Sequence, residues 1–267
     1  MTASGPSDSR ELLVAVQALA LAASRMFGIA AFLPTLGKRL IGRAATNAVC
    51  LAVSLPQAVM LFDALNGREA LLWAGALVGL KEAAIGCVIG LALSVPFWAL
   101  RGALTMVDNQ RGANAAQLLD PTHEPDASIL GELAERAFIA YLAEAGLFAL
   151  IFDIIADTYV AWPILAPWTG VAKEAQATAV NLFQQSLLDT LAYGAPALLM
   201  VLLVDVGLAC ISAVVEGVQV YAMAPAVKAL LATFAVALGI GGLLRWTATD
   251  FEQAARTHAI LNLVPSR

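Results

Sequence analysis

The chain has 267 residues, of which 60% are hydrophobic and 13% are charged, whereas about 25% of the residues in a soluble domain are charged. Together with a mean hydropathy of +0.80, this composition excludes an ordinary soluble domain and indicates a membrane protein. The net charge of −5 points to no nucleic-acid partner, and the lack of a CxxC spacing among Cys50, Cys87 and Cys210 argues against a disulfide framework or a zinc site.

The first ten residues are polar and lack the features of a signal peptide, so we expect an uncleaved polar tail over residues 1–10. Six apolar runs follow, and each approaches the roughly 20 residues that a membrane-spanning helix needs. They cover residues 12–36, 44–62, 70–100, 137–155, 191–215 and 218–244. Alanine, leucine and valine dominate them, which predicts helices rather than barrel strands. We therefore predict an all-α membrane protein with one domain over residues 1–267, and with a sixth helix that is broken near Pro225.

Charged residues interrupt these runs more often than a lipid-facing bundle tolerates. They are Arg25, Lys81, Glu82, Glu144, Asp153, Asp205, Glu216 and Lys228. Each costs about 2.5–3.5 kcal/mol near the centre of a membrane helix. Two interpretations are open, namely pairing between helices of the chain and contact with other subunits or a water-filled conduit. Lys81 and Glu82 point about 100° apart on a helix, so they cannot simply neutralise each other and at least one needs another partner.

The third run contains two pairs of glycines with helical spacing. Gly75 and Gly79 form the first pair, and Gly86 and Gly90 form the second. Glycines four residues apart let two helix backbones approach closely. Both pairs on one segment predict a helix that packs tightly along much of its length.

A polar string follows the third run, because Asp108, Asn109, Gln110, Arg111 and Gly112 come in a row. Lipid cannot satisfy such residues, so they are expected to face water, a partner or a pore. The stretch around them, residues 101–136, stays half apolar. A cytoplasmic loop and a segment lodged in a protein-lined channel both remain open, and the half-apolar character fits the channel better.

The second half of this stretch carries the signals of a new helix. Proline at residues 121 and 125 stops any helix there. Asp126 or Ser128 is then expected to cap the next helix, with Glu132 and Glu135 in or near its first turns.

Catalytic constellations are absent from the sequence, which has two histidines, no HExxH and no GxSxG. We therefore predict a non-enzymatic protein without a metal or cofactor. Asp153 and Asp157 are spaced to share a helix face and could relay protons, but the nearby Trp162 favours a helix end at the membrane interface. Residues 159–170 are interpreted as an aromatic-belt loop, with a re-entrant broken helix as the alternative.

Two segments resemble a known family. The stretch KEAAIGCVIGLALSVPFWALRGALTMVDNQRGA, residues 81–113, is similar to the inner-membrane export-apparatus protein of type III secretion systems. This is the SctT family, also called YscT, HrcT or SpaR, with the flagellar homologue FliR. A second match begins at Asp205 and includes the family's Pro-x-x-Lys, here Pro225 to Lys228. Chain length and the six apolar runs match the family over essentially the whole chain.

The resemblance implies a non-enzymatic subunit of the export gate in the bacterial inner membrane. Its implied partners are SctR-, SctS- and SctU-like subunits, membrane lipid and the unfolded polypeptides that are exported. The implied fold is a set of kinked helical hairpins within a closed pseudo-ring that lies largely above the bilayer plane. In such a ring the buried charges are expected at subunit or pore contacts, and they are Arg25, Lys81, Glu82, Asp205 and Lys228.

In the family, the segment after the third long helix forms a plug in the pore. On this chain that segment is roughly residues 106–130. The candidate gate residues are Met106, Asp108, Asn109, Gln110, Arg111 and Gly112. The single domain is then expected to comprise the tail 1–10, a plug-containing connection over 101–136 and a C-terminal tail over 245–267.

The chain departs from injectisome members of the family between Asp205 and Pro225. Those members often carry an arginine, Ala-Pro-Gln and an asparagine, where this chain has Ala213, Val215-Glu216-Gly217 and Gln219. No role of those family residues is therefore carried over. The Asp-Asn-Gln-Arg-Gly string still favours an injectisome over a flagellar or symbiotic apparatus.

A secondary transporter of a small solute is the alternative function. Its support is the set of buried charges, including Asp153, Asp205 and Lys228. Such transporters often have matched halves with broken helices, but no convincing pairing relates the first three runs to the last three.

Overall fold

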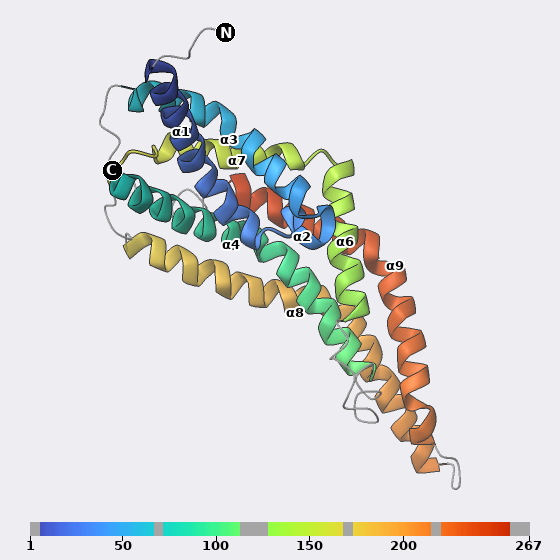
Figure 1. The fold of residues 1–267 in the computed structure, drawn as a ribbon. Coiled ribbons are helices and arrows are strands. Elements are labelled where there is room, and N and C mark those ends of the chain that lie inside the picture. Colours follow the sequence, from blue (N-terminus) through green and yellow to red (C-terminus); the bar gives the residue numbers. More distant parts are fainter. Residues whose placement is uncertain (1–5, 67–71, 113–127, 168–172, 215–219, 257–267) are drawn as a thin grey trace. The chain divides into compact units, whose positions relative to one another are not determined.

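The computed structural model of the chain describes residues 6–66, 72–112, 128–167, 173–214 and 220–256 (Figure 1). All elements of this described part are helices, which confirms the predicted all-α fold. They are α1 (Pro6–Phe32), η1 (Pro34–Leu36), α2 (Lys38–Ile41), α3 (Arg43–Leu65), α4 (Leu72–Gln110), α6 (Ile129–Glu144), α7 (Phe148–Ala161), α8 (Lys173–Val214) and α9 (Val220–Arg256). Asp126, Glu216 and residues 113–127 of the expected plug lie outside the described residues.

Membrane-length helices occur where five of the six apolar runs predict them. In the described part of the chain, α1, α3, α4, α8 and α9 are each long and apolar enough to cross a membrane. The chain is therefore a multi-pass membrane protein by the length and composition of its helices.

The fourth apolar run is bent rather than straight, because α6 and α7 meet at 84°. The φ angle of Gly146 is +72°, a conformation that glycine adopts without strain. Its N–H donates to the carbonyl of Ala143 at 3.3 Å, and the N–H of Leu147 donates to that of Leu142 at 2.9 Å. These two bonds form a Schellman motif, which ends α6 and starts α7 in a new direction.

Three predicted boundaries are wrong. The break near Pro225 does not occur, because α9 continues through this residue; Pro225 lies in the second turn and removes one backbone hydrogen bond close to the helix end. The C-terminal tail does not begin at residue 245, since α9 extends to Arg256. The N-terminal tail ends sooner than expected, because α1 begins at Pro6, a residue that suits the first position of a helix.

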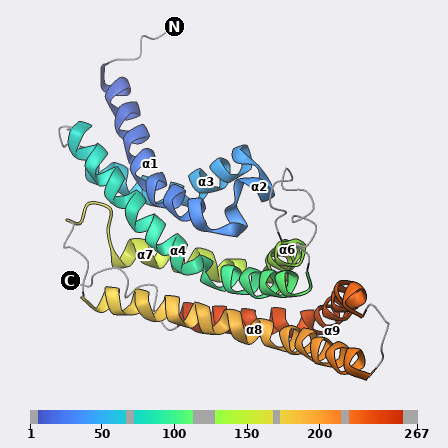
Figure 2. The same ribbon diagram turned by 90° about the horizontal axis from the view of Figure 1, so that it is seen from below.

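The chain forms two compact units, and α4 and α8 each contribute to both. The first unit contains α1, η1, α2, α3, α4 up to Ser94, most of α7 and the start of α8. Within it, α1 and α3 pack side by side as an antiparallel pair (Figures 1 and 2). Fully buried side chains of α1 and α4, including Met26, Ile29 and Ile89, fill its core.

The second unit contains α4 from Val95, α6, α8 from Leu182 and α9 up to Gln253. Phe97 of α4 lies edge-on to Phe138 of α6 and to Phe251 of α9, with ring centroids 5.0 Å and 6.4 Å apart. Edge-to-face pairs of this kind stabilise a core beyond the area that they bury. The antiparallel α8 and α9 lie along each other (Figure 2), and the Tyr193 hydroxyl donates to Asp250 across them at 2.8 Å.

Candidate functional site

A buried ion pair joins α1 to α4 in the first unit. The side chains of Arg25 and Glu82 are both fully buried, and the Arg25 Nε and Nη2 atoms lie 2.7 Å and 2.6 Å from Glu82 Oε2. These residues are 57 positions apart, so the pair forms only when the helices pack. Removing two charges from water is costly, and the attraction compensates only if the remaining donors also find partners.

The other donors of Arg25 are satisfied by the C-terminal end of α7. Its Nη1 donates to the Thr158 carbonyl at 2.8 Å, and its Nη2 donates to the Trp162 carbonyl at 2.9 Å. The guanidinium lies 4.2 Å from the ring centroid of Tyr159, a favourable cation–π contact. The Tyr159 hydroxyl in turn donates to the carbonyl of Ala22 at 3.0 Å. Arg25 thus ties α1, α4 and α7 together.

Lys81 extends this cluster to the turn after α7. Its Nζ donates to the carbonyls of Ile164 and Ala166 at 2.7 Å and 2.8 Å, and lies 3.0 Å from Glu82 Oε1. The expectation that Lys81 or Glu82 needs another partner is confirmed, since both have one. The two side chains nevertheless also contact each other, because the long lysine stem is flexible enough to reach its neighbour.

The expected aromatic-belt loop, residues 159–170, begins later than predicted. Its first three residues belong to α7, and the turn that accepts hydrogen bonds from Lys81 follows. α7 ends at Ala161, and the Ala166 N–H donates to the Pro163 carbonyl at 2.9 Å. Asp153 and Asp157 are both exposed on α7. A role for these carboxylates as a proton relay stays a prediction.

Close backbone contact between α1 and α4 brings the buried charges together. A Cβ added at Gly86 would collide with the carbonyl oxygen of Arg25, and one at Gly90 would lie 2.7 Å from the carbonyl oxygen of Ile29. On the facing helix, Gly28 has equally little room, since its Cβ would collide with backbone atoms of α4. Glycine at these positions allows the two backbones to touch.

The other predicted glycine pair faces side chains instead of backbone. A Cβ at Gly75 would lie 3.0 Å from Gln17 Nε2, and one at Gly79 would lie 3.5 Å from Ser24 Oγ. The two helices are therefore less tightly packed toward the start of α4.

A second buried charge, Asp108, lies at the C-terminal end of α4 in the second unit. Its Oδ2 atom accepts hydrogen bonds from Ser128 Oγ at 2.6 Å and from the Leu130 N–H at 2.9 Å. Ser128 is itself the N-cap of α6, because its hydroxyl accepts from the Gly131 N–H at 2.9 Å. The predicted cap at Ser128 is confirmed. The expectation that Asp108 faces water, a partner or a pore is wrong, because this carboxylate is 2% exposed and bonded within the chain.

Arg111 continues the contacts of Asp108 toward α9. Its Nε lies 2.8 Å from Asp108 Oδ1, and its Nη1 donates to Thr233 Oγ1 at 3.1 Å. Gly112 then ends α4 with a φ angle of +87°, a backbone conformation typical of the residue after a helix. A Cβ at Gly112 would lie 3.8 Å from the Pro225 side chain, so this end of α4 lies beside α9.

The remaining candidate gate residues are exposed. Asn109 and Gln110 form the last positions of α4, and Met106 is 37% exposed one turn before them. The polar string is thus divided between the buried Asp108, the half-buried Arg111 and Gly112, and the exposed Asn109 and Gln110. The structure brings all six candidates to one helix end.

Further ion pairs lie in the second unit. Lys228 of α9 pairs with Asp205 of α8, and Arg101 of α4 lies 2.9 Å from Glu135 of α6. Asp205 and Lys228, two of the charges predicted at subunit or pore contacts, therefore pair with each other within the chain.

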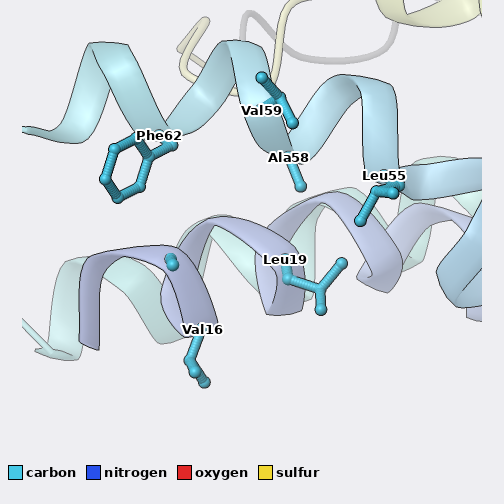
Figure 3. A pocket seen from close by; sticks show the side chains of 7 residues that line it. Val16, Leu19, Leu55, Ala58, Val59 and Phe62 are labelled. Atoms are coloured by element: carbon cyan, nitrogen blue, oxygen red, sulfur yellow. The ribbon is translucent and has the colours of Figure 1, made fainter. Parts of the chain in front are cut away.

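An apolar groove runs between α1 and α3 (Figure 3). It measures about 400 Å³ and is lined by Ala15, Val16, Leu19, Leu55, Ala58, Val59 and Phe62. These walls offer no polar side chain to orient a reactive substrate. Among the described residues, no group of three or more His, Cys, Asp or Glu side chains is placed to hold a metal ion.

Sequence patterns alone miss several partners in these clusters. Arg25 and Lys81 bond to backbone carbonyls of the α7 end and the following turn, and every residue type has such a carbonyl. The Asp108 contact with Ser128 spans 20 positions. The only sequence signal for it is the polar character of both helix ends.

The chain is similar to known proteins over most of its length. The sequence model of the family described as bacterial export proteins, family 1, matches residues 16–254. The Yop proteins translocation protein T of Yersinia pestis is 33% identical over 153 residues, which cover 57% of this chain and 59% of that protein.

Two Salmonella typhimurium proteins match over a longer part. The surface presentation of antigens protein SpaR is 27% identical over 225 residues, which cover 84% of this chain and 82% of that protein. The secretion system apparatus protein SsaT is 25% identical over 221 residues, which cover 80% of this chain and 83% of that protein. The match thus spans about three fifths of the Yersinia relative and about four fifths of the Salmonella relatives.

Proposed function

Because the chain belongs to family 1 of the bacterial export proteins, we propose that it is a non-enzymatic subunit of the export gate of a type III secretion apparatus. The family match from residue 16 to 254 carries this proposal, since it includes every candidate gate residue. Membership also confirms the resemblance that residues 81–113 predicted. Relatives named for translocation of Yop proteins and for a secretion system apparatus support the same role.

Large apolar surfaces support a place in the inner membrane beside SctR-, SctS- and SctU-like subunits. In the most apolar part of α8 and of α9, 11% is buried within the chain, compared with 50% in α1 and α4. Leu203 and Phe234 are among the exposed side chains. Apolar surface of this extent requires lipid or protein to cover it. We propose that both lipid and neighbouring subunits cover this apolar surface.

We propose that the end of α4, residues 106–112, is the closing segment of the conduit for unfolded polypeptide. Its support is the juxtaposition of exposed polar side chains, Asn109 and Gln110, with a glycine that ends the helix. Polar groups at the end of a membrane-length helix need water or protein around them. The interior of a protein-lined conduit would provide both.

A secretion assay tests the general role. Cells that lack the gene are expected to secrete no substrate of the apparatus, and the intact chain is expected to restore secretion. Normal secretion without the chain would contradict the proposal.

Deleting residues 109–113 is expected to raise the leakage of small ions through assembled gates reconstituted in liposomes, because the proposed closing segment is shortened. Arg136→Ala is the control, since this residue lies on the surface of α6 in an exposed pair with Glu132. Leakage equal to that of the control, in gates shown to contain all subunits, would refute the closing role.

The transporter alternative has less support. Asp205 and Lys228 pair with each other, so each neutralises a charge that a coupled ion would otherwise have to neutralise. A transporter would also move its solute as a purified single chain, which separates the two functions by experiment.

A further inference from the structure

Asp108 connects two elements that are distant in sequence. It lies in the last turn of α4, yet it accepts hydrogen bonds from Ser128 and Leu130 at the start of α6. The end of α4 and the start of α6 therefore meet at one carboxylate.

The charge of Asp108 lies between two helix ends that have opposite effects on it. The N-terminal end of α6 favours a negative charge, and the carboxylate accepts a charge-assisted hydrogen bond from the Leu130 N–H there. The C-terminal end of α4, in whose last turn Asp108 lies, carries partial negative charge and disfavours it. A nearby cation offsets this cost and stabilises the carboxylate further.

Arg111 supplies that stabilisation. Its Nε is 2.8 Å from Asp108 Oδ1, a contact close in distance but outside hydrogen-bond geometry. The same guanidinium reaches Thr233 of α9 through Nη1 at 3.1 Å. One arginine thus links the carboxylate that holds α6 to a third helix, α9.

We propose that Asp108 is a positioning residue that, together with Arg111, clasps the end of α4 to α6 and α9 and so holds the closing segment in its resting position. The inference rests on the proposed closing function. It assigns Asp108 and Arg111 to holding the segment, and leaves the exposed Asn109 and Gln110 to face the conduit.

Point variants separate the clasp from simple helix capping. Asp108→Asn keeps an acceptor for Ser128 and Leu130 but loses the charge, whereas Asp108→Ala loses both. Arg111→Met breaks the link to α9 and leaves the cap intact, and Arg111→Lys keeps a cation. Thr233→Val removes the α9 end of the link.

The measurement is ion leakage of reconstituted gates, normalised to assembled complex and accompanied by the thermal midpoint of that complex. Arg111→Met and Asp108→Asn are each expected to raise leakage about tenfold, the population change that loss of about 1.4 kcal/mol causes. The double variant is expected to leak no more than either single one, because both break the same contact. Arg111→Lys is expected to restore tightness, which a change in stability alone would not produce.

Other outcomes overturn the inference. If Asp108→Ala leaks while Arg111→Met and Thr233→Val stay tight, Asp108 only caps α6. If none of the point variants leaks but the 109–113 deletion does, the clasp is wrong and the closing function stands. If the deletion is tight as well, the closing function itself fails. Because Asp108→Asn retains both contacts to α6, at least one informative variant is expected to fold.

Discussion

Replacing Arg25 with methionine is expected to lower the free energy of unfolding by about 3 kcal/mol, because Glu82 then stays buried without its main counter-charge. Lys81 remains 3.0 Å from Glu82, so the loss should lie at the lower end for a broken buried pair. Methionine removes the charge of Arg25 and keeps an unbranched stem of similar length. Unfolding of the purified chain in detergent micelles gives the measurement.

Two further variants make the Arg25 result specific. Arg136→Met, in the exposed pair with Glu132, is expected to change stability by less than about 0.5 kcal/mol. The double variant Arg25→Met with Glu82→Gln should lose less free energy of unfolding than the two single variants lose together, because it also removes the carboxylate that Arg25→Met leaves buried without its partner. A loss below about 1 kcal/mol for Arg25→Met would contradict the role assigned to this pair.

Replacing Gly86 with valine is expected to cost about 2–3 kcal/mol, because the new side chain meets the backbone of α1 rather than a movable side chain. The helices would have to separate, and the Arg25–Glu82 pair would move with them. Thermal unfolding of the purified chain measures the effect.

Gly239→Ala, at a position with open space, is the control for this prediction. Nothing lies within 4 Å of a Cβ added at Gly239, and alanine favours a helix by about 1 kcal/mol over glycine. This variant should therefore be neutral or more stable. Equal destabilisation by the two substitutions would show that the α1–α4 contact is not limited by backbone approach.

Much of the fold could be predicted from apolar length alone, and the exceptions have local causes. The start of α8 was missed because residues 173–190 contain many polar side chains, among them Gln184 and Gln185, which interrupt an apolar run without interrupting a helix. The bend between α6 and α7 depends on Gly146. One glycine inside an apolar run does not by itself predict a positive φ angle.

The candidate site was predictable in composition but not in its contacts. The charges of Arg25, Lys81 and Glu82 inside apolar runs indicated that they need partners, and the structure provides those partners within the chain. Pairing between distant helices depends on the packing register, which periodicity does not specify. For the same reason the sequence does not distinguish Asp108 from its polar neighbours, although it alone is buried against α6.

The central claim is that this chain works as one subunit of a multi-protein export gate. Purification of a tagged chain from its native membranes, followed by subunit identification and stoichiometry, tests it most directly. We expect a complex of fixed stoichiometry that contains SctR- and SctS-like small membrane proteins. Recovery of the chain alone, in a form that transports a small solute in liposomes, would contradict the account.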